Sequence, residues 1–263
     1  MSHKPKFRRN IRWAMLFSLL LATLLGWAVE HHKRQAAPKT APGPDAAPAV
    51  AYDPALLQEL ADKLRTLDLN QPRCLIEGSI DLTDGQDTAS SARDLAYIFC
   101  RNGKDFYGRL GDAETIHHGT QNIYIRHDLK RVVLSAQAIT LRPPMVAAGA
   151  LLAYLRNESY SLRASVSGRS RTLSLVNEHH LACKEISLTY DTLSGKPQRV
   201  LTRTPDLSDP ANPEKDRVTT LRILHSAASG KPGRYTAPAD VVQKENGKWK
   251  LTGKYAGYKL IML

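Results

Sequence analysis

"KDFYGRLGDAETIHHGTQNIYIRHDLKRVVLS", residues 104–135, alternates apolar and polar side chains in short runs that are separated by turn residues. A period of two is typical of a β-strand, because successive side chains point to opposite faces of a sheet. Asn102-Gly103, just before it, is a strong hairpin signal, and Gly119-Thr120 provides a second turn. The stretch therefore predicts antiparallel strands joined by tight turns. It has no phosphate-binding loop, no catalytic-triad spacing and no pair of cysteines.

The same alternation extends over most of the remaining chain. Residues 74–82, "CLIEGSIDL", and residues 158–168, "ESYSLRASVSG", both have a period of two. Short strands at regular spacing with hairpin signals are typical of one large antiparallel sheet. The other strand-like runs are 94–101, 171–176, 184–191, 197–204, 217–226, 234–242 and 248–255.

Two segments have helical patterns. Asp53 can cap a first helix, Pro54 suits its first turn, and an apolar stripe follows at helical spacing. The second segment, residues 144–155, is apolar on most sides and too short to span a bilayer, so we expect it to lie buried across the sheet. Layer packing then predicts a mainly β (α+β) fold: a large curved antiparallel sheet forming a half-open β-barrel covered by two helical segments. The stripe of the first helix comprises Leu56, Leu57, Leu60, Ala61 and Leu64.

A charge-free run precedes this domain. Residues 13–29, "WAMLFSLLLATLLGWAV", follow five Lys or Arg residues and reach the short end of the length of about 17–25 residues that a membrane span needs. The charge asymmetry predicts a single-pass protein of the inner (cytoplasmic) membrane, with its N-terminus inside and its domain in the periplasm. A cleaved signal peptide is the alternative. The predicted organisation is a basic cytoplasmic segment (1–12), the anchor (13–29), an Ala/Pro-rich tether (30–52) and one β domain (53–263).

The net charge of +12 first suggests a nucleic-acid partner. Half of it belongs to residues 1–34, which hold seven Lys or Arg and one acid. In the remainder, the basic residues are scattered among acids without a basic block or an aromatic–basic motif. The sequence therefore predicts a membrane partner through residues 13–29 and no nucleic acid.

Candidate metal ligands and thiols are few. His117-His118 lies in a strand-like run, where neighbours point to opposite faces, and His179-His180 with Cys183 lacks a second thiolate for a structural zinc set. We predict no metal and no cofactor. Cys74 and Cys100 lie in strand-like runs and are the preferred disulfide pair; buried free thiols are the alternative.

Candidate catalytic groups are equally sparse. Asp81 and Asp84 could form a carboxylate pair, but nothing else near them supports acid–base chemistry. The serines of the strand faces lack an adjacent base, and the acids of the first helix, including Glu59, are interpreted as solvated. The sequence predicts a protein that is not an enzyme and has no catalytic residue.

The order of a helix, a long meander, an apolar helix and more meander over residues 53–263 resembles the LolA/LolB-like family of periplasmic lipoprotein carriers and receptors. The rhythm of residues 104–135 is similar to that family's middle strands. The resemblance implies an unclosed β-barrel with a helical lid and an apolar cavity suited to acyl chains. The family's functional arginine has no single counterpart here, so no residue role is transferred.

The predicted ligand site lies between the apolar helix and the inner face of the sheet, with ordinary core packing as the alternative. The leading hypothesis is a non-enzymatic, membrane-anchored envelope protein that binds a lipid, a lipoprotein or an acylated partner. The alternative is an assembly subunit of an envelope-spanning machine, such as a secretion system, that docks another envelope protein at a sheet edge. The predicted cavity residues are Tyr107, Ile123, Ile125, Leu134, Met145, Ala148, Leu152 and Leu155.

Overall fold

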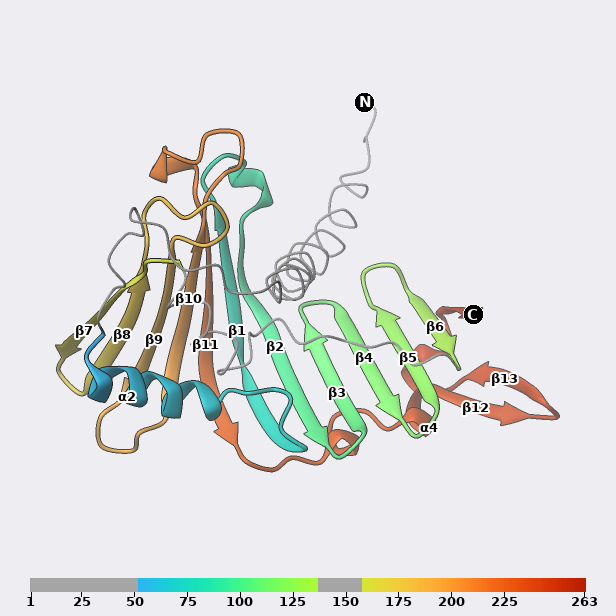
Figure 1. The fold of residues 1–263 in the computed structure, drawn as a ribbon. Coiled ribbons are helices and arrows are strands. Elements are labelled where there is room, and N and C mark those ends of the chain that lie inside the picture. Colours follow the sequence, from blue (N-terminus) through green and yellow to red (C-terminus); the bar gives the residue numbers. More distant parts are fainter. Residues whose placement is uncertain (1–51, 137–157) are drawn as a thin grey trace, which may run out of the picture.

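The computed structural model describes residues 52–136 and 158–263, and within them the fold is one large open sheet. Twelve strands form the sheet in the order β14-β6-β5-β4-β3-β2-β1-β11-β10-β9-β8-β7, with a separate hairpin, β12-β13 (Figure 1). The strands of the first half are β1 (Arg73–Asp84), β2 (Ala92–Asn102), β3 (Asp105–Leu110), β4 (Ala113–His118), β5 (Gln121–Arg126) and β6 (Arg131–Ser135). Those of the second half are β7 (Ser161–Ser167), β8 (Ser170–Val176), β9 (Glu185–Asp191), β10 (Pro197–Thr204), β11 (Arg217–Ala227), β12 (Val242–Glu245), β13 (Lys248–Leu251) and β14 (Lys259–Met262).

The predicted meander is confirmed, and the prediction of a wholly antiparallel sheet needs correction. Strands β2 to β6 pair in succession, with Asn102 opposite Asp105 and Gly103 at a positive φ of 63° in the turn between β2 and β3. The sheet is mixed rather than wholly antiparallel, because β14 runs parallel to β6 with Lys259 opposite Arg131. The sheet is unclosed, as predicted, since β14 and β7 form its two edges and pair with one strand each within the described ranges.

Helix α2 (Pro54–Arg65) is the predicted first helix. The Asp53 carboxylate accepts a hydrogen bond from the Ala55 N–H at 2.9 Å, which satisfies one of the free donors at the helix start. Leu60, Ala61 and Leu64 of the predicted stripe are buried. The other α-helix within the described ranges is α4 (Pro238–Val241), and four short 3₁₀ turns lie at Thr88–Ser90, Pro213–Lys215, Pro232–Arg234 and Gly253–Tyr255.

Several predicted segments lie outside the described residues. They are the basic segment 1–12, the anchor 13–29, all but the last residue of the tether 30–52, and the apolar helix 144–155. In the two described ranges, no helix combines the length and the apolar character that are needed to cross a membrane.

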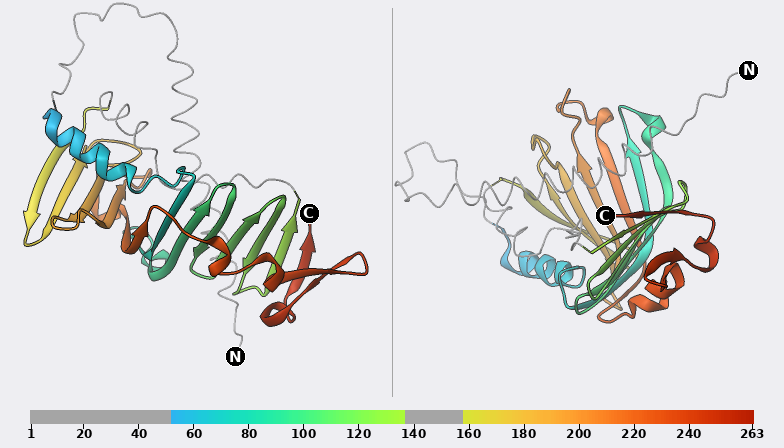
Figure 2. Two further views of the ribbon diagram at one scale, coloured as in Figure 1. Left: turned by 90° about the horizontal axis from the view of Figure 1, so that it is seen from below. Right: turned by 90° about the vertical axis from the view of Figure 1, so that its right-hand side faces the viewer.

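The sheet has an apolar core on each face. In β1, Cys74 and Ile76 belong to the core beneath α2, whereas Leu75 between them belongs to a second core formed with the C-terminal segment. In β2, Phe99 and Cys100 divide in the same way. Since neighbouring side chains in a strand point to opposite faces, α2 and the C-terminal segment cover opposite sides of the sheet (Figure 2). We call these sides the α2 face and the C-terminal face.

Strands β1 and β11 lie close together at Gly78. The pairing of the two strands shifts between Glu77 and Gly78, which leaves Leu224 of β11 as an extra residue between Ile223 and His225. A Cβ at Gly78 would lie 1.9 Å from the carbonyl oxygen of Arg222, so only glycine fits there. This β-bulge re-aims the end of β11, where the structure has a surface hollow.

Candidate functional site

The α2 face carries the larger apolar surface. Its core includes Leu173 and Leu188 under α2 and extends across β11, β1 and β2. The buried members of this core on those three strands are Leu221, Ile223, Cys74, Ile76, Ile80, Tyr97 and Phe99. Half-buried apolar side chains on β2, β3, β7, β9 and β10 continue the surface: Leu95, Leu110, Leu162, Ile186 and Val200.

Helix α2 is held over one end of this face by polar contacts. The Arg171 guanidinium of β8 donates two hydrogen bonds to the Glu59 carboxylate, at 2.7 and 3.0 Å, and the Tyr190 hydroxyl of β9 also contacts Glu59. The Lys63 ammonium donates to the carbonyl of Gly195 at 3.1 Å. Glu59 is therefore an anchor of the helix, and its interpretation as a solvated acid was wrong. The Arg171 hydrogen bonds lower the pKa of Glu59, against the opposing effect of burial.

The apolar surface is wider than the helix. The polar contacts of α2 are with β8, β9 and the turn after β9, so the helix crosses only that end of the sheet (Figure 1). Leu67 and Leu69, which follow the helix, add to the same core. Among the described residues, no other helix covers the α2 face where it continues over β11, β1 and β2.

One polar group is enclosed in this apolar surface. Tyr97 of β2 is 7% exposed, and its hydroxyl has no hydrogen-bond partner among the described residues. Burial raises the pKa of Tyr97, so the hydroxyl stays protonated and can donate a hydrogen bond. An enclosed hydroxyl without a partner costs about 1–3 kcal/mol, which a bound oxygen acceptor would recover.

The C-terminal face contains four of the predicted cavity residues. Tyr107, Ile123, Ile125 and Leu134 do lie together, but they pack against the chain's own C-terminal segment and are at most 4% exposed. The C-terminal side chains in this core are Val241, Val242 and Tyr255. The other four predicted residues, Met145, Ala148, Leu152 and Leu155, lie outside the described residues. Contact between the two groups, and with a ligand, stays a prediction.

A buried polar cluster lies within the C-terminal core. The Glu114 carboxylate is 2.7 Å from Nε2 of His127, whose Nδ1 is 3.0 Å from the Tyr258 hydroxyl. The Thr236 hydroxyl donates to Glu114 at 3.3 Å. Burial, and then the neighbouring Glu114, raise the pKa of Tyr107. The cluster joins β4 and the turn after β5 to the C-terminal segment. The sequence analysis did not predict it because Thr236 and Tyr258 lie more than 100 positions beyond Glu114 and His127.

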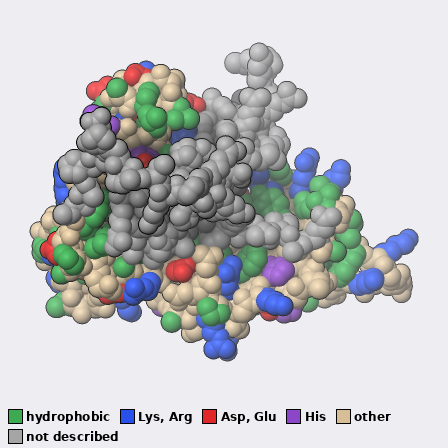
Figure 3. All heavy atoms as spheres, viewed as in Figure 1, with side chains coloured by type: hydrophobic (Ala, Val, Ile, Leu, Met, Phe, Trp, Pro, Cys, Tyr) green, Lys and Arg blue, Asp and Glu red, His purple; other side chains and the backbone are tan. Residues whose placement is uncertain are grey.

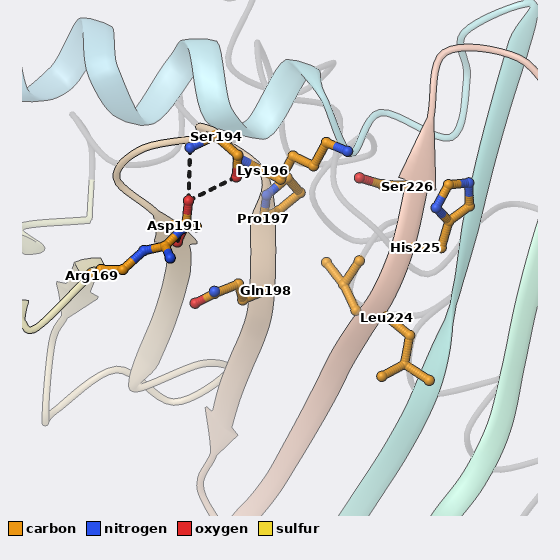
Figure 4. Close-up of a pocket in the computed structure, with 10 residues that line it drawn as sticks. Arg169, Asp191, Ser194, Lys196, Pro197, Gln198, Leu224, His225 and Ser226 are labelled. Atoms are coloured by element: carbon orange, nitrogen blue, oxygen red, sulfur yellow. Dashed lines mark hydrogen bonds and ion pairs between the residues drawn. The ribbon is translucent and has the colours of Figure 1, made fainter.

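A polar hollow of about 360 Å³ lies where β10 and β11 separate (Figure 4). The two strands pair from Thr204–Arg217 to Arg199–Arg222 and part beyond that point. The Asp191 carboxylate on one side is 3.1 Å from Arg169 and accepts hydrogen bonds from the N–H and the hydroxyl of Ser194. The Lys196 side chain extends toward β11 (Figure 4). The rim residue Leu224 is 82% exposed, so the hollow is an open polar notch rather than an acyl cavity.

The carboxylates considered as a catalytic pair have other partners. Asp81 pairs with Arg222 at 2.8 Å, and Asp84 pairs with Arg217 at 2.6 Å. Asp84 also accepts hydrogen bonds from the backbone N–H groups of Gln86 and Asp87, which fixes the turn after β1. Each carboxylate therefore holds a separate strand-to-strand contact.

The histidines are engaged in local contacts. His117 Nδ1 is 2.7 Å from the Asn122 side-chain oxygen, and His118 Nδ1 is 3.0 Å from Asp105. His180 Nδ1 accepts hydrogen bonds from two backbone N–H groups, including that of Cys183 at 2.9 Å. No group of three or more His, Cys, Asp or Glu side chains within 52–136 and 158–263 is arranged to hold a metal ion.

The preferred disulfide between Cys74 and Cys100 was wrong. All three cysteines are free, and these two belong to cores on opposite faces of the sheet. Cys100 lies opposite Leu75, so Cys74 is one residue out of register and points away from it. Burial raises the pKa of Cys100 to about 11 and that of Cys183 to about 12.

Basic side chains are spread over several elements in the face shown in Figure 3, as the scattered sequence pattern indicates. Many of them are in ion pairs with acids of neighbouring strands. Arg203, for example, contacts Glu178 at 2.6 Å and Asp216 at 3.0 Å, and Lys184 contacts Asp216 at 2.8 Å. This cluster joins β10 to the segments before β9 and β11.

No protein-family model and no curated protein matches this chain. Similar solved structures include an uncharacterized conserved protein from Thermus thermophilus, with a TM-score of 0.38, 8% identity, and coverage of 78% of this chain and 98% of that chain. A LolA superfamily protein from Nitrosomonas europaea has a TM-score of 0.27 and 10% identity, and covers 72% of this chain and 99% of its own. A DUF1329 family protein from Desulfovibrio piger has a TM-score of 0.27 and 11% identity, with 72% and 99% coverage. A protein of the LolA superfamily, the family that the sequence resembles, is therefore one of the solved structures with a reported similarity.

Proposed function

We propose that the protein is a non-enzymatic binding protein of the cell envelope whose α2 face takes the acyl chain of a lipid or of a lipidated protein. The observation that carries this proposal is the extent of the apolar surface, which continues over β11, β1 and β2 beyond the strands that α2 crosses. Apolar area removed from water contributes about 25 cal/mol for each Å². The core members on β11, β1 and β2 are at most 9% exposed, so the area open to an acyl chain is that of the half-buried side chains beside them, Leu95, Leu110 and Val200. The part of the ligand that the α2 face binds is therefore a hydrocarbon chain.

Tyr97 adds a polar element to this proposal. Its buried hydroxyl lies within the apolar core of β2 and has no hydrogen-bond partner among the described residues. Acyl groups carry an ester, amide or carboxyl oxygen at one end, and such an oxygen is an acceptor for this donor. We propose that Tyr97 orients the head of the acyl chain, while the apolar side chains around it hold the tail.

The membrane anchor belongs to the same proposal. Residues 13–29 would hold the domain at the periplasmic side of the inner membrane, where acyl chains are available. A non-enzymatic role is supported because the candidate catalytic side chains are already held by other side chains. Asp81 and Asp84 are paired with arginines, and His127 is enclosed between Glu114 and Tyr258.

The alternative function, an assembly subunit that docks another envelope protein at a sheet edge, is favoured by one observation. Strand β7 is an edge strand whose residues from Arg163 to Ser167 are all exposed. The two functions involve different parts of the sheet, so one experiment can separate them.

The test is photolabelling of the full-length protein in lipid nanodiscs that contain a phospholipid with a photoreactive acyl chain. Cross-linked positions are mapped by mass spectrometry of peptides, and labelling of residues 13–29 serves as the internal reference. We expect labels on β1, β2 and β11 in addition to the anchor. Leu95→Gln at the border of the α2 face should reduce these labels several-fold relative to the anchor. The matched control is Leu224→Gln, which changes an exposed leucine outside the apolar cores and should leave labelling unchanged.

A second variant tests the role of Tyr97. Tyr97→Phe removes one buried oxygen without a partner, so the thermal stability of the protein should stay the same or rise. Labelling of β2 should nevertheless fall, because the oxygen at the head of the acyl chain loses the Tyr97 hydroxyl as its hydrogen-bond donor. Labels confined to residues 13–29 in the wild type, or an equal loss in Leu95→Gln and Leu224→Gln, would refute acyl binding and favour the assembly subunit.

A further inference from the structure

Strand β7 is a sheet edge with few protective features among the described residues. It pairs with β8 on one side, and no strand in the described ranges pairs with its other side (Figures 1 and 2). Natural edge strands are commonly protected by prolines, bulges or several charges, since free backbone groups invite pairing with another chain. β7 has no proline, no register shift against β8 and a single charged residue, Arg163. Such an edge is suited to pairing with a further strand.

The β7–β8 turn defines which backbone groups face outward. Ser167 and Ser170 flank a two-residue turn that begins with Gly168 at a φ of 57°, as a type II′ hairpin requires. Residues that flank such a turn exchange hydrogen bonds, and along an antiparallel ladder every second residue does so. The residues bonded to β8 are therefore Ser161, Arg163, Ser165 and Ser167. The residues whose N–H and C=O groups face the free edge are Leu162, Ala164 and Val166.

The sequence of β7 is nearly symmetric about Ala164, and only Arg163 and Ser165 break the symmetry. In "SLRASVS", positions 161 and 167 are both serine, and positions 162 and 166 are both branched aliphatic residues. If a second β7 lies antiparallel with Ala164 opposite Ala164, then Leu162 lies opposite Val166. All three outward-facing residues of each strand then fall on hydrogen-bonded positions of the new ladder, so every free N–H and C=O finds a partner.

The side chains fit the same register. Leu162 packs with the α2 core, and Ala164 and Val166 share its face of the strand, where Val166 is 61% exposed. In the symmetric register, Val166 gains a cross-strand aliphatic neighbour from the second copy on that face. On the other face, Arg163 lies opposite Ser165 of the second copy, so no like charges oppose each other directly.

We propose that the protein forms a two-fold symmetric dimer by antiparallel pairing of β7 with β7 of a second copy, centred on Ala164. The occupant of the edge is a second copy because the edge is complementary to itself in hydrogen bonding and in side-chain size, and because the register places no like charges directly opposite each other. A closed two-fold contact uses the same edge on both chains, so pairing ends at two copies at this strand. This proposal does not depend on acyl binding, since β7 lies outside β1, β2 and β11.

The first test uses opposite charges at the symmetry centre. Full-length wild type, Ala164→Lys and Ala164→Glu are compared by analytical ultracentrifugation in the same detergent, with folding checked by circular dichroism. We expect a wild-type dimer, a loss of the dimer in each single variant because like charges lie opposite each other, and recovery of a mixed dimer when the two variants are combined. The matched control, Leu193→Lys, replaces a 77% exposed leucine in the turn after β9 and should stay dimeric.

The second test is a gain of function and does not depend on losing an interaction. In the proposed register the two Ala164 Cα atoms are about 5.5 Å apart, within the range that a disulfide bridges. Ala164→Cys should therefore form a covalent dimer under mild oxidation, whereas Thr192→Cys in the exposed turn after β9 should not. A wild type that stays a single chain at all concentrations, an Ala164→Lys variant that remains dimeric, or an Ala164→Cys variant that links no faster than Thr192→Cys would overturn the proposal.

Discussion

Replacing Glu59 by Gln tests how α2 is attached to the sheet. The change keeps the size of the side chain but removes the charge that receives two hydrogen bonds from Arg171. Exposed ion pairs contribute about 0–1 kcal/mol, while hydrogen bonds to charged groups contribute about 1.5–3 kcal/mol. The side chains of Arg171 and Glu59 are 31% and 25% exposed, so an intermediate loss of about 1–2 kcal/mol is expected.

The measurement is unfolding of wild type and Glu59→Gln by heat and by urea. A loss of this size corresponds to a fall in Tm of about 2–8 °C for a domain of about 200 residues. The control is Asp62→Asn on the same helix, because Asp62 and Arg65 form an exposed pair at 51% and 61% exposure. We expect the control to change the free energy of unfolding by less than about 0.5 kcal/mol. Equal effects of the two substitutions would show that Glu59 does not anchor the helix.

The pH dependence gives an independent readout of the same contact. Arg171 lowers the pKa of Glu59 below its ordinary value of 4.5 in the folded protein. A carboxylate with a lowered folded pKa contributes stability that is fully present above its unfolded pKa and is lost as the pH falls through the folded pKa. The stability difference between wild type and Glu59→Gln should therefore be constant above about pH 4.5 and shrink below it. A difference that does not change on acidification would contradict this account.

Other parts of the chain give three further predictions. A C-terminal alkaline phosphatase fusion should be active and a cytoplasmic reporter silent, because the proposed anchor, residues 13–29, has more Lys and Arg before it than just after it and the more basic side stays in the cytoplasm; the opposite result would contradict the proposed localisation. Ile123→Ala should cost about 2–5 kcal/mol in urea unfolding, since Ile123 is 0% exposed in the C-terminal core, whereas Leu224→Ala should cost less than about 0.5 kcal/mol. Cys100 and Cys183 should react slowly with iodoacetamide at pH 8 until denaturant is added, because burial raises their thiol pKa to about 11 and about 12; rapid labelling of the native protein would refute this.

The meander could be predicted because its signals are local. Hairpin turns such as Asn102-Gly103 set both the turn type and the register of the strands beside them, so β2 and β3 follow from a few neighbouring residues. The strand predicted at 234–242 was wrong for a similarly local reason. Pro238 starts helix α4, and the Asp240 carboxylate accepts a hydrogen bond from the Ala237 N–H, so only Val242 continues into β12.

The two-faced core was not predicted, although the sequence contained a sign of it. Cys74, Leu75 and Ile76 are consecutive and all buried, as are Phe99 and Cys100 on the neighbouring strand. A strand that is buried on both faces loses its alternation and becomes continuously apolar. Which segment covers each face depends on contacts between residues far apart in the chain, such as Tyr107 with Tyr255 and Leu260 with Val132. A period-two pattern holds no information about such partners.

Edge pairing and acyl binding are compatible because of the direction in which side chains point. Leu162, Ala164 and Val166 share the α2 face of β7, and a two-fold axis through Ala164 perpendicular to the sheet keeps the α2 faces of both copies on the same side. Each copy retains its own β1, β2 and β11, so the loss of the dimer in Ala164→Lys should leave photolabelling per chain unchanged. Conversely, Tyr97→Phe should reduce labelling in a protein that remains dimeric. If either variant reduced both dimer formation and photolabelling, the β7 edge and the α2 face would be coupled through the strands between β7 and β2.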